Sequence, residues 1–229
     1  MADAHSSSDY TNEQMGKFLL FLERVRKADI SIPTVSSDNS AALLTTNLNH
    51  FDANAILTQP GADTRGWVRI GGAIYGQRPS FPQLRAVSTL MASVQNVAVV
   101  KKGESVGYDR AYLASMDVRI ATVTIGFADG YPRELGNGVG KVSIRGGVFP
   151  IAGNICMDML MVELGPADES EGTGSQIKVG DVAVLWGPET DEDDGDGLVR
   201  LQDIAKILKT TQSALTCGLN KVRVQRQLS

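Results

Sequence analysis

The sequence has little of the chemistry that metal sites and disulfide frameworks need, since its 229 residues include only two cysteines and two histidines. Cys156 and Cys217 lie far apart, without the close spacing of metal-binding cysteine pairs. Two ordinary thiols are typical of an intracellular chain. The count excludes a catalytic histidine cluster, and we expect no bound metal.

Long apolar runs are also missing. No stretch approaches the roughly 18–20 uninterrupted apolar residues of a membrane span. The first ten residues, MADAHSSSDY, are polar, whereas a secretory signal begins with basic residues followed by an apolar run. We therefore expect a cytoplasmic protein that has no membrane partner.

An excess of positive charge is absent as well. The chain carries 22 Lys and Arg against 26 Asp and Glu, for a net charge of -4. This balance argues against nucleic acid as the partner. The acidic excess is local, because residues 189–196 (ETDEDDGD) hold six acids and no base. We interpret that segment as a solvated loop.

The first 80 residues have the pattern of an α/β protein. Apolar positions recur at helical spacing over residues 11–28, after a polar start that resembles a capping box. A short apolar segment at 30–35 precedes a polar cap and a helix beginning at residue 41. Residues 66–76 indicate a further strand that ends in a glycine turn. Residues 1–80 therefore resemble the last two βα units of a larger α/β array.

Beyond two prolines near residue 80 the pattern changes to short β-branched or alternating runs separated by glycine-rich turns, as in a β-sandwich or a small barrel. The expected strands are residues 87–100, 118–125, 141–144, 148–151, 159–164 and 181–185. A helix at 201–208 and a last strand at 218–225 follow. We place a domain junction within residues 79–86, with a β-rich domain over residues 85–229.

Five segments, in this order, are similar to the alanine racemase family of pyridoxal-phosphate enzymes. They are DNSAA (38–42), VRIGGAIYG (68–76), VGYDRAY (106–112), IGFADGYPR (125–133) and GNICMD (153–158). The resemblance implies a TIM-type (β/α)8 barrel followed by an all-β C-terminal domain. Because a complete barrel takes about 250 residues, this chain can hold only the end of the barrel, in residues 1–80, and the β domain.

One expected motif is missing from the sequence. The family attaches its cofactor covalently to a lysine in a Lys-Ala-Asn-Ala-Tyr-Gly motif, and no lysine here has that context. The sequence therefore represents either a gene product truncated at its start or one piece of a split enzyme. We expect the isolated chain to be inactive or nearly so.

The resemblance implies that Tyr108 is one of two proton-transfer groups that flank the substrate carbon. The other group is the missing lysine. In the family this tyrosine is supplied across a dimer interface, so the expected partners are a second copy of the chain or a complementary barrel fragment, together with a small amino-acid substrate. An ordinary strand tyrosine is the alternative.

Five further residues are implied in binding pyridoxal 5'-phosphate. Arg69 matches the arginine that faces the pyridine nitrogen, and as a permanent donor it would leave that nitrogen unprotonated. Asn39 and Ser40 begin a predicted helix, and Gly71 and Gly72 offer bare backbone amides, which suits a phosphate group. A surface salt bridge for Arg69 and a plain helix cap for Asn39 and Ser40 remain alternatives.

Met157 and Asp158 match the loop that meets the substrate carboxylate, and Arg133 matches a residue at the substrate entrance. Met157 is equally suited to filling a core. Three positions depart from the family pattern, which has tyrosine at the positions of Phe127 and Ser213 and arginine at that of Asn154. These departures leave the true substrate open.

Two functions of different kinds follow. The first is an alanine racemase, of which this chain is the C-terminal part. The second is a non-catalytic binding or dimerisation module that keeps the racemase fold, and the three departures favour it. A nucleic-acid-binding barrel is disfavoured by the acidic balance.

Overall fold

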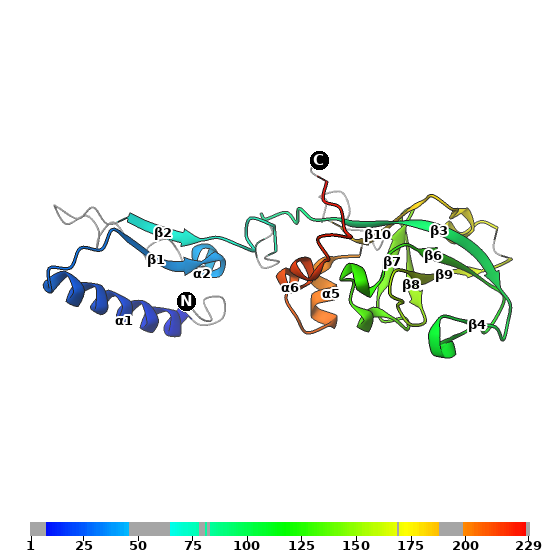
Figure 1. Cartoon of the computed structure of the whole chain (residues 1–229), viewed down its shortest axis with the longest axis horizontal. Coiled ribbons are helices and arrows are strands. Elements are labelled where there is room, and N and C mark those ends of the chain that lie inside the picture. The colour runs from blue at the N-terminus through cyan, green and yellow to red at the C-terminus, as the bar shows by residue number, and fades with distance from the viewer. Residues whose placement is uncertain are drawn as a thin grey trace. The chain divides into compact units, whose positions relative to one another are not determined.

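In the computed structural model the chain forms two compact units, Met1–Leu84 and Arg85–Ser229 (Figure 1). The residues described are 8–45, 65–77, 81, 83–168, 170–187 and 199–227. The acidic loop at 189–196 lies outside them.

The first unit contains helix α1 (Ser8–Lys27), strand β1 (Thr34–Asn39), helix α2 (Ser40–Thr45) and strand β2 (Arg65–Arg69). Strands β1 and β2 pair in parallel, with Val35 opposite Gly66. Parallel neighbouring strands need a crossover connection, which fits the predicted succession of βα units. The predicted helix at 11–28 is confirmed.

The strand predicted within 66–76 is shorter than that range, and the glycine turn predicted at its end is present. The strand ends at Arg69, and the chain then turns through backbone hydrogen bonds from Ile74 N–H to Gly71 C=O and from Gln77 N–H to Gly72 C=O. The glycine pair, which has no side chains to favour an extended ladder, allows this turn.

Helix α1 buries one face. Thr11, Met15 and Leu22 are buried, and their spacing places them on a single stripe of the helix. Leu20 and Phe21 are exposed, as is Trp67 on β2. This unit therefore leaves large apolar side chains uncovered on its own surface.

The second unit is a closed β-barrel, which decides between the two predicted architectures. Its strands follow the order β10-β3-β6-β9-β8-β7, and every pairing is antiparallel. The strands are β3 (Leu90–Val100), β6 (Val118–Val123), β7 (Lys141–Ile144), β8 (Gly147–Ala152), β9 (Leu160–Pro166) and β10 (Val182–Trp186). Each overlaps its predicted range. Closure removes the unpaired edges that an open sheet would expose.

The barrel interior is filled by side chains from every strand. Val123, Ile144, Leu160 and Leu185 are fully buried. Tyr131 stacks on Trp186 with ring centroids 6.4 Å apart. This packed core gives the surrounding loops a rigid base.

Short elements decorate the barrel. They are β4 (Ser105–Val106), the 3-10 helix η2 (Tyr108–Arg110), β5 (Tyr112–Leu113), the 3-10 helices η3 (Phe127–Asp129) and η4 (Arg133–Leu135), helix α4 (Thr173–Gln176), helix α5 (Leu201–Ile207) and helix α6 (Gln212–Gly218). Helix α5 confirms the helix predicted at 201–208. None of the described helices has the length and apolarity that crossing a membrane requires.

The last predicted strand, at 218–225, is wrong. Helix α6 reaches Gly218, and a turn follows in which the Asn220 side-chain oxygen accepts hydrogen bonds from the N–H groups of Val222 and Arg223. An asparagine that bonds the backbone ahead of it competes with strand pairing. Val222 is almost fully exposed, so its β-branched side chain has no sheet face to cover.

Candidate active site

Tyr108 lies at the tip of a short hairpin formed by β4 and β5. The tip, residues 107–110, has three left-handed backbone positions, with φ of 78° at Gly107, 62° at Asp109 and 52° at Arg110. Within its own unit the Tyr108 side chain is 68% exposed. The hairpin therefore displays this phenol to the outside.

The base of the hairpin is held on the barrel. Val106 pairs with Tyr112, and both pack on a buried cluster that includes Met161 of β9. Burial, with a smaller contribution from the Glu163 carboxylate, raises the pKa of Tyr112 to about 12. The hairpin is thus held against β9 by apolar packing.

Asn154 ties the tip to the loop after β8. Its amide nitrogen lies 3.3 Å from the Tyr108 carbonyl oxygen and 3.2 Å from a carboxylate oxygen of Asp109. Its amide oxygen accepts a hydrogen bond of 2.9 Å from Asn137. The sequence marks Asn154 only as a departure from the family pattern, and the link to Tyr108 is visible only in the structure.

The loops at 126–133 and 153–158 are joined by their backbones. Phe127 N–H donates to Cys156 C=O at 3.0 Å, and Ala128 N–H donates to Met157 C=O at 2.8 Å. Gly126 makes this approach possible, because a Cβ there would lie 2.3 Å from the carbonyl oxygen of Cys156. Two segments far apart in the sequence therefore form one surface.

The predicted substrate residues lie on that surface. Met157 is 60% exposed, which excludes the core-filling interpretation, and Asp158 and Arg133 are exposed. The Arg133 guanidinium lies 5.9 Å from the centre of the Phe127 ring, a cation–π distance. Burial and the Asp158 charge raise the pKa of the Cys156 thiol, while the Arg133 charge lowers it. Both charged residues are therefore near Cys156.

Asp129 fixes the same surface to the end of the chain. Its buried carboxylate accepts hydrogen bonds from Gly126 N–H at 2.8 Å and from the Arg223 guanidinium at 2.7 Å. The hydrogen bond between Arg223 and Asp129, followed by the charge of the Asp129 carboxylate, raises the pKa of Arg223. The Asn220 amide group also donates to Ala128 C=O at 3.0 Å.

In the first unit, the predicted phosphate residues are neighbours. Asn39 caps helix α2, because its side-chain oxygen accepts from the N–H groups of Ala41 and Ala42 at 3.0 Å. The buried Ser40 hydroxyl oxygen accepts from Gly71 N–H at 2.9 Å. Asn39 thus caps helix α2, as the alternative interpretation expects, and capping is compatible with a contact between these residues and a phosphate.

These residues have the chemistry that a phosphate needs. Ser40 acts as an acceptor toward Gly71, so its own hydroxyl proton is left to donate. No heavy atom lies within 4 Å of the position that a Cβ would take at Gly71, which gives an anion room to approach the backbone. Gly72 is half-buried beside it. The set fits the phosphate of pyridoxal phosphate.

Arg69, at the end of β2, points toward β1. Its guanidinium donates to the Ser36 hydroxyl at 2.9 Å and to the Ser36 carbonyl at 3.1 Å. It also lines a cavity of about 230 Å³ together with Ser36, Ser37, Gln14, Met15 and Phe18. These contacts are to neutral groups, which differs from the predicted salt-bridge alternative.

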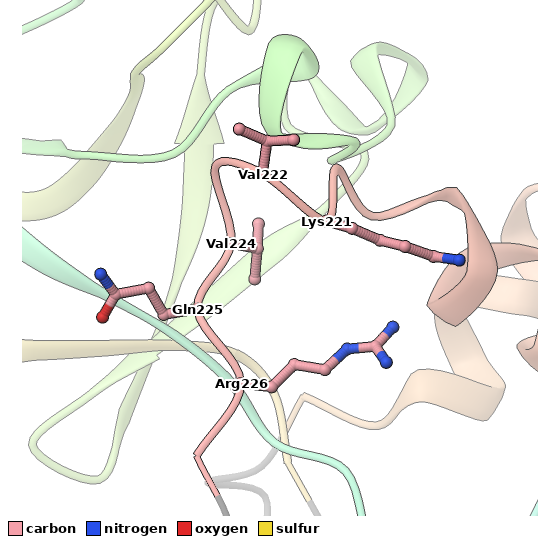
Figure 2. A pocket seen from close by; sticks show the side chains of 5 residues that line it. All are labelled: Lys221, Val222, Val224, Gln225 and Arg226. Carbon is pink, nitrogen blue, oxygen red and sulfur yellow. The ribbon is translucent and has the colours of Figure 1, made fainter.

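A second cavity, of about 450 Å³, contains none of the predicted site residues. It is lined by Lys221, Val222, Val224, Gln225 and Arg226 of the C-terminal segment. Figure 2 shows that Lys221 and Arg226 extend to one side of this segment and Gln225 to the other.

Comparison with known proteins identifies the family. The family model described as alanine racemase, C-terminal domain, matches residues 87–228, and the one described as alanine racemase, N-terminal domain, matches residues 1–79. This chain belongs to the alanine racemase family. The predicted membership is confirmed, and alanine racemases are isomerases that use pyridoxal phosphate.

Individual alanine racemases match over nearly the whole chain. That of Cutibacterium acnes is 32% identical over 230 residues, which are 99% of this chain and 54% of the relative. The Clostridium difficile structure in complex with cycloserine has a TM-score of 0.73 and 29% identity, over 96% of this chain and 52% of its own. The Bartonella henselae structure, with covalently bound pyridoxal phosphate, has a TM-score of 0.69 and 28% identity, over 96% and 53%. The chain thus spans about half the length of the relatives it matches.

Proposed function

We propose that this chain contributes the C-terminal part of an alanine racemase, and that Tyr108 is one of its two proton-transfer groups. The observation that carries the proposal is the hairpin tip, which projects a phenol from a rigid barrel. Family membership supports the same assignment. A tyrosine that served only to fill space would be buried.

Racemisation removes the proton from the substrate Cα on one face and returns a proton on the other. Pyridoxal phosphate, when bound, withdraws electrons from that carbon so that its proton can leave. Tyr108 would hold or accept a proton at its phenolic oxygen on one of the two faces. The exposed side chain supports delivery to a site formed with another chain, and we propose a homodimer.

The first unit would hold the cofactor. Ser40 would donate its hydroxyl proton to the phosphate and Gly72 its backbone amide, while Gly71, whose N–H donates to Ser40, would leave room for the anion. Arg69 would face the pyridine nitrogen as a donor that cannot accept a proton, which keeps the ring a moderate electron sink and favours proton exchange. Asn39 would act indirectly, by fixing the start of α2 beside Ser40.

The surface made by loops 126–133 and 153–158 would bind the substrate. Met157 would offer backbone groups and a flexible apolar side chain, and Arg133 a positive charge that suits a carboxylate. Asp158 balances that charge near Cys156. Phe127 lacks a hydroxyl at this surface, which favours an apolar contact over a hydrogen bond.

The other proton-transfer group, which in the family is the cofactor lysine, does not occur in this sequence. We propose that residues 1–80 are the last βα units of a TIM-type barrel, and that the remaining barrel segments, with the cofactor lysine, must join them in the cytoplasm to complete the site. The exposed Leu20, Phe21 and Trp67 support this, because the missing segments would cover them. The chain alone is then inactive.

The test is complementation. The full chain, pyridoxal phosphate and a barrel fragment carrying the family's lysine motif are combined, and conversion of L-alanine to D-alanine is followed by circular dichroism. Activity is expected only when all three are present, and Tyr108→Phe is expected to abolish it. Tyr10→Phe on helix α1 is the matched control and leaves the rate unchanged. Racemisation by the chain and cofactor without the fragment would refute the proposal.

A non-catalytic module is the second candidate. The observation in its favour is that Phe127, which replaces the usual tyrosine, is exposed among the substrate residues. In that case the chain still dimerises, but no barrel fragment restores racemisation of alanine. Tyr108→Phe then has no effect on the rate of alanine racemisation.

A further inference from the structure

The backbone that carries Tyr108 needs external support. Asp109 and Arg110 adopt left-handed conformations, with φ of 62° and 52°. Each such non-glycine residue is strained and persists only where surrounding contacts enforce it. Among the described residues the hairpin itself supplies one long backbone hydrogen bond, from Ala111 N–H to Tyr108 C=O at 3.3 Å, and one side-chain bond, from Arg110 Nε to the Ser105 hydroxyl at 3.1 Å. The second bond holds Arg110, and neither bond reaches the side chain of Asp109.

Asn154 supplies that support from outside the hairpin. One NH₂ group donates to the backbone carbonyl of Tyr108 and to the side chain of Asp109, so it holds the residue that carries the phenol and the strained residue that follows it. An amide NH₂ has two protons, and each has an acceptor here. The carboxylate of Asp109 strengthens the second bond because it is charged.

The orientation of Asn154 is itself fixed. Its oxygen accepts from the Asn137 side chain at 2.9 Å, and the backbone N–H of Asn137 donates to Gly153 C=O at 2.7 Å. The chain of bonds runs from Asn137 through Asn154 to Tyr108 and Asp109. Arginine, the usual family residue, can donate but cannot accept from Asn137. This relay thus needs the amide that the sequence places here.

We propose that Asn154 is a positioning residue that holds the tip so that Tyr108 presents its phenol in one orientation. The inference rests on the proposed function of Tyr108 for its catalytic meaning. The ordering of the tip by Asn154 is independent of that function and is measured without activity.

The test is hydrogen–deuterium exchange on the full chain. In Asn154→Ala, peptides covering residues 105–113 should exchange roughly tenfold faster, as expected for the loss of two hydrogen bonds. In Asn137→Ala the increase should be smaller, since only the orienting bond is lost. Peptides from β6 and β9 should not change. Asn96→Ala, an exposed asparagine on β3, is the matched control.

A double variant that swaps the two side-chain types distinguishes a lost contact from simple misfolding. Asn154→Asp keeps the shape but removes the donors and faces the Asp109 carboxylate, so the tip should loosen at least as much as in Asn154→Ala. The double variant Asn154→Asp with Asp109→Asn restores a donor and an acceptor in reverse, and should recover part of the protection. Unchanged exchange at 105–113, or equal acceleration in the barrel strands, would overturn the proposal.

The complemented enzyme separates this inference from the proposed function. There, Asn154→Ala should lower kcat several-fold with little change in KM, because it disturbs the proton-transfer group and not substrate binding. A loosened tip together with full activity of Tyr108→Phe would refute the function and leave the positioning intact. If Tyr108→Phe abolished activity but Asn154→Ala left exchange at the tip unchanged, the positioning role would be refuted and the proposed function would stand.

Discussion

Replacing Gly126 by alanine should separate the two loops of the proposed substrate surface. The added Cβ would lie 2.3 Å from the carbonyl oxygen of Cys156 and 2.4 Å from that of Met157, both rigid backbone atoms. A relaxed contact requires the two segments to move apart by roughly 1 Å. The hydrogen bonds from Phe127 and Ala128, now 3.0 and 2.8 Å long, would then exceed the usual range.

The magnitude follows from those two bonds. Each contributes about 1 kcal/mol net, and a buried group left without a partner adds a further penalty, while alanine recovers about 0.5–1 kcal/mol by restricting the unfolded chain. We expect a loss of about 2–3 kcal/mol. At about 2–4 °C for each kcal/mol in a domain of this size, the melting temperature falls by roughly 5–10 °C.

The assay is urea unfolding followed by fluorescence of Trp186, which is buried in the barrel, in a Trp67→Phe background that removes the exposed tryptophan of the first unit. Gly218→Ala is the control, because no heavy atom lies within 4 Å of its Cβ position and its φ is not positive. That variant should unfold close to the parent. If Gly126→Ala were as stable as Gly218→Ala, the close approach of the loops would be wrong.

Two other predictions concern the supports of the site. The pKa of Tyr112 is raised to about 12, against about 10 in an unfolded chain. The folded state therefore binds the phenolic proton more tightly. This contribution to the free energy of unfolding is complete below about pH 10 and is lost between about pH 10 and 12. Tyr112→Phe should flatten the decline in the free energy of unfolding over that interval in urea titrations, and an unchanged slope would contradict the raised pKa of Tyr112. Asn39→Ala should cost about 1 kcal/mol by uncapping α2, measured as faster amide exchange at Ala41 and Ala42. Unaltered exchange there would show that Asn39 does not cap the helix.

The sequence was sufficient for elements whose pattern is local. The six barrel strands are predicted within a few residues because each is a short β-branched or alternating run bounded by turn residues. The strand expected at 218–225 failed because its β-branched residues meet no sheet, and the side chain of Asn220 turns the backbone instead. A pattern of Val and polar residues cannot by itself show whether a partner strand is available.

The sequence predicted which residues belong to the candidate site, but not which of them contact one another. Motifs pointed to Tyr108, Arg69 and Met157. They did not show that Asn154 grips the Tyr108 tip, because that contact joins residues 46 positions apart through a side-chain amide. Nor does spacing reveal the link from Tyr112 to Glu163, which depends on how the hairpin folds back over β9.

The most direct test of the central claim is exchange of the substrate α-proton in D₂O, measured separately on L-alanine and D-alanine by the complemented enzyme. If Tyr108 serves one face of the carbon, Tyr108→Phe should abolish exchange of one enantiomer, retain exchange of the other through the fragment's lysine, and stop net racemisation. Wild-type exchange of both enantiomers in that variant would contradict the assignment of Tyr108.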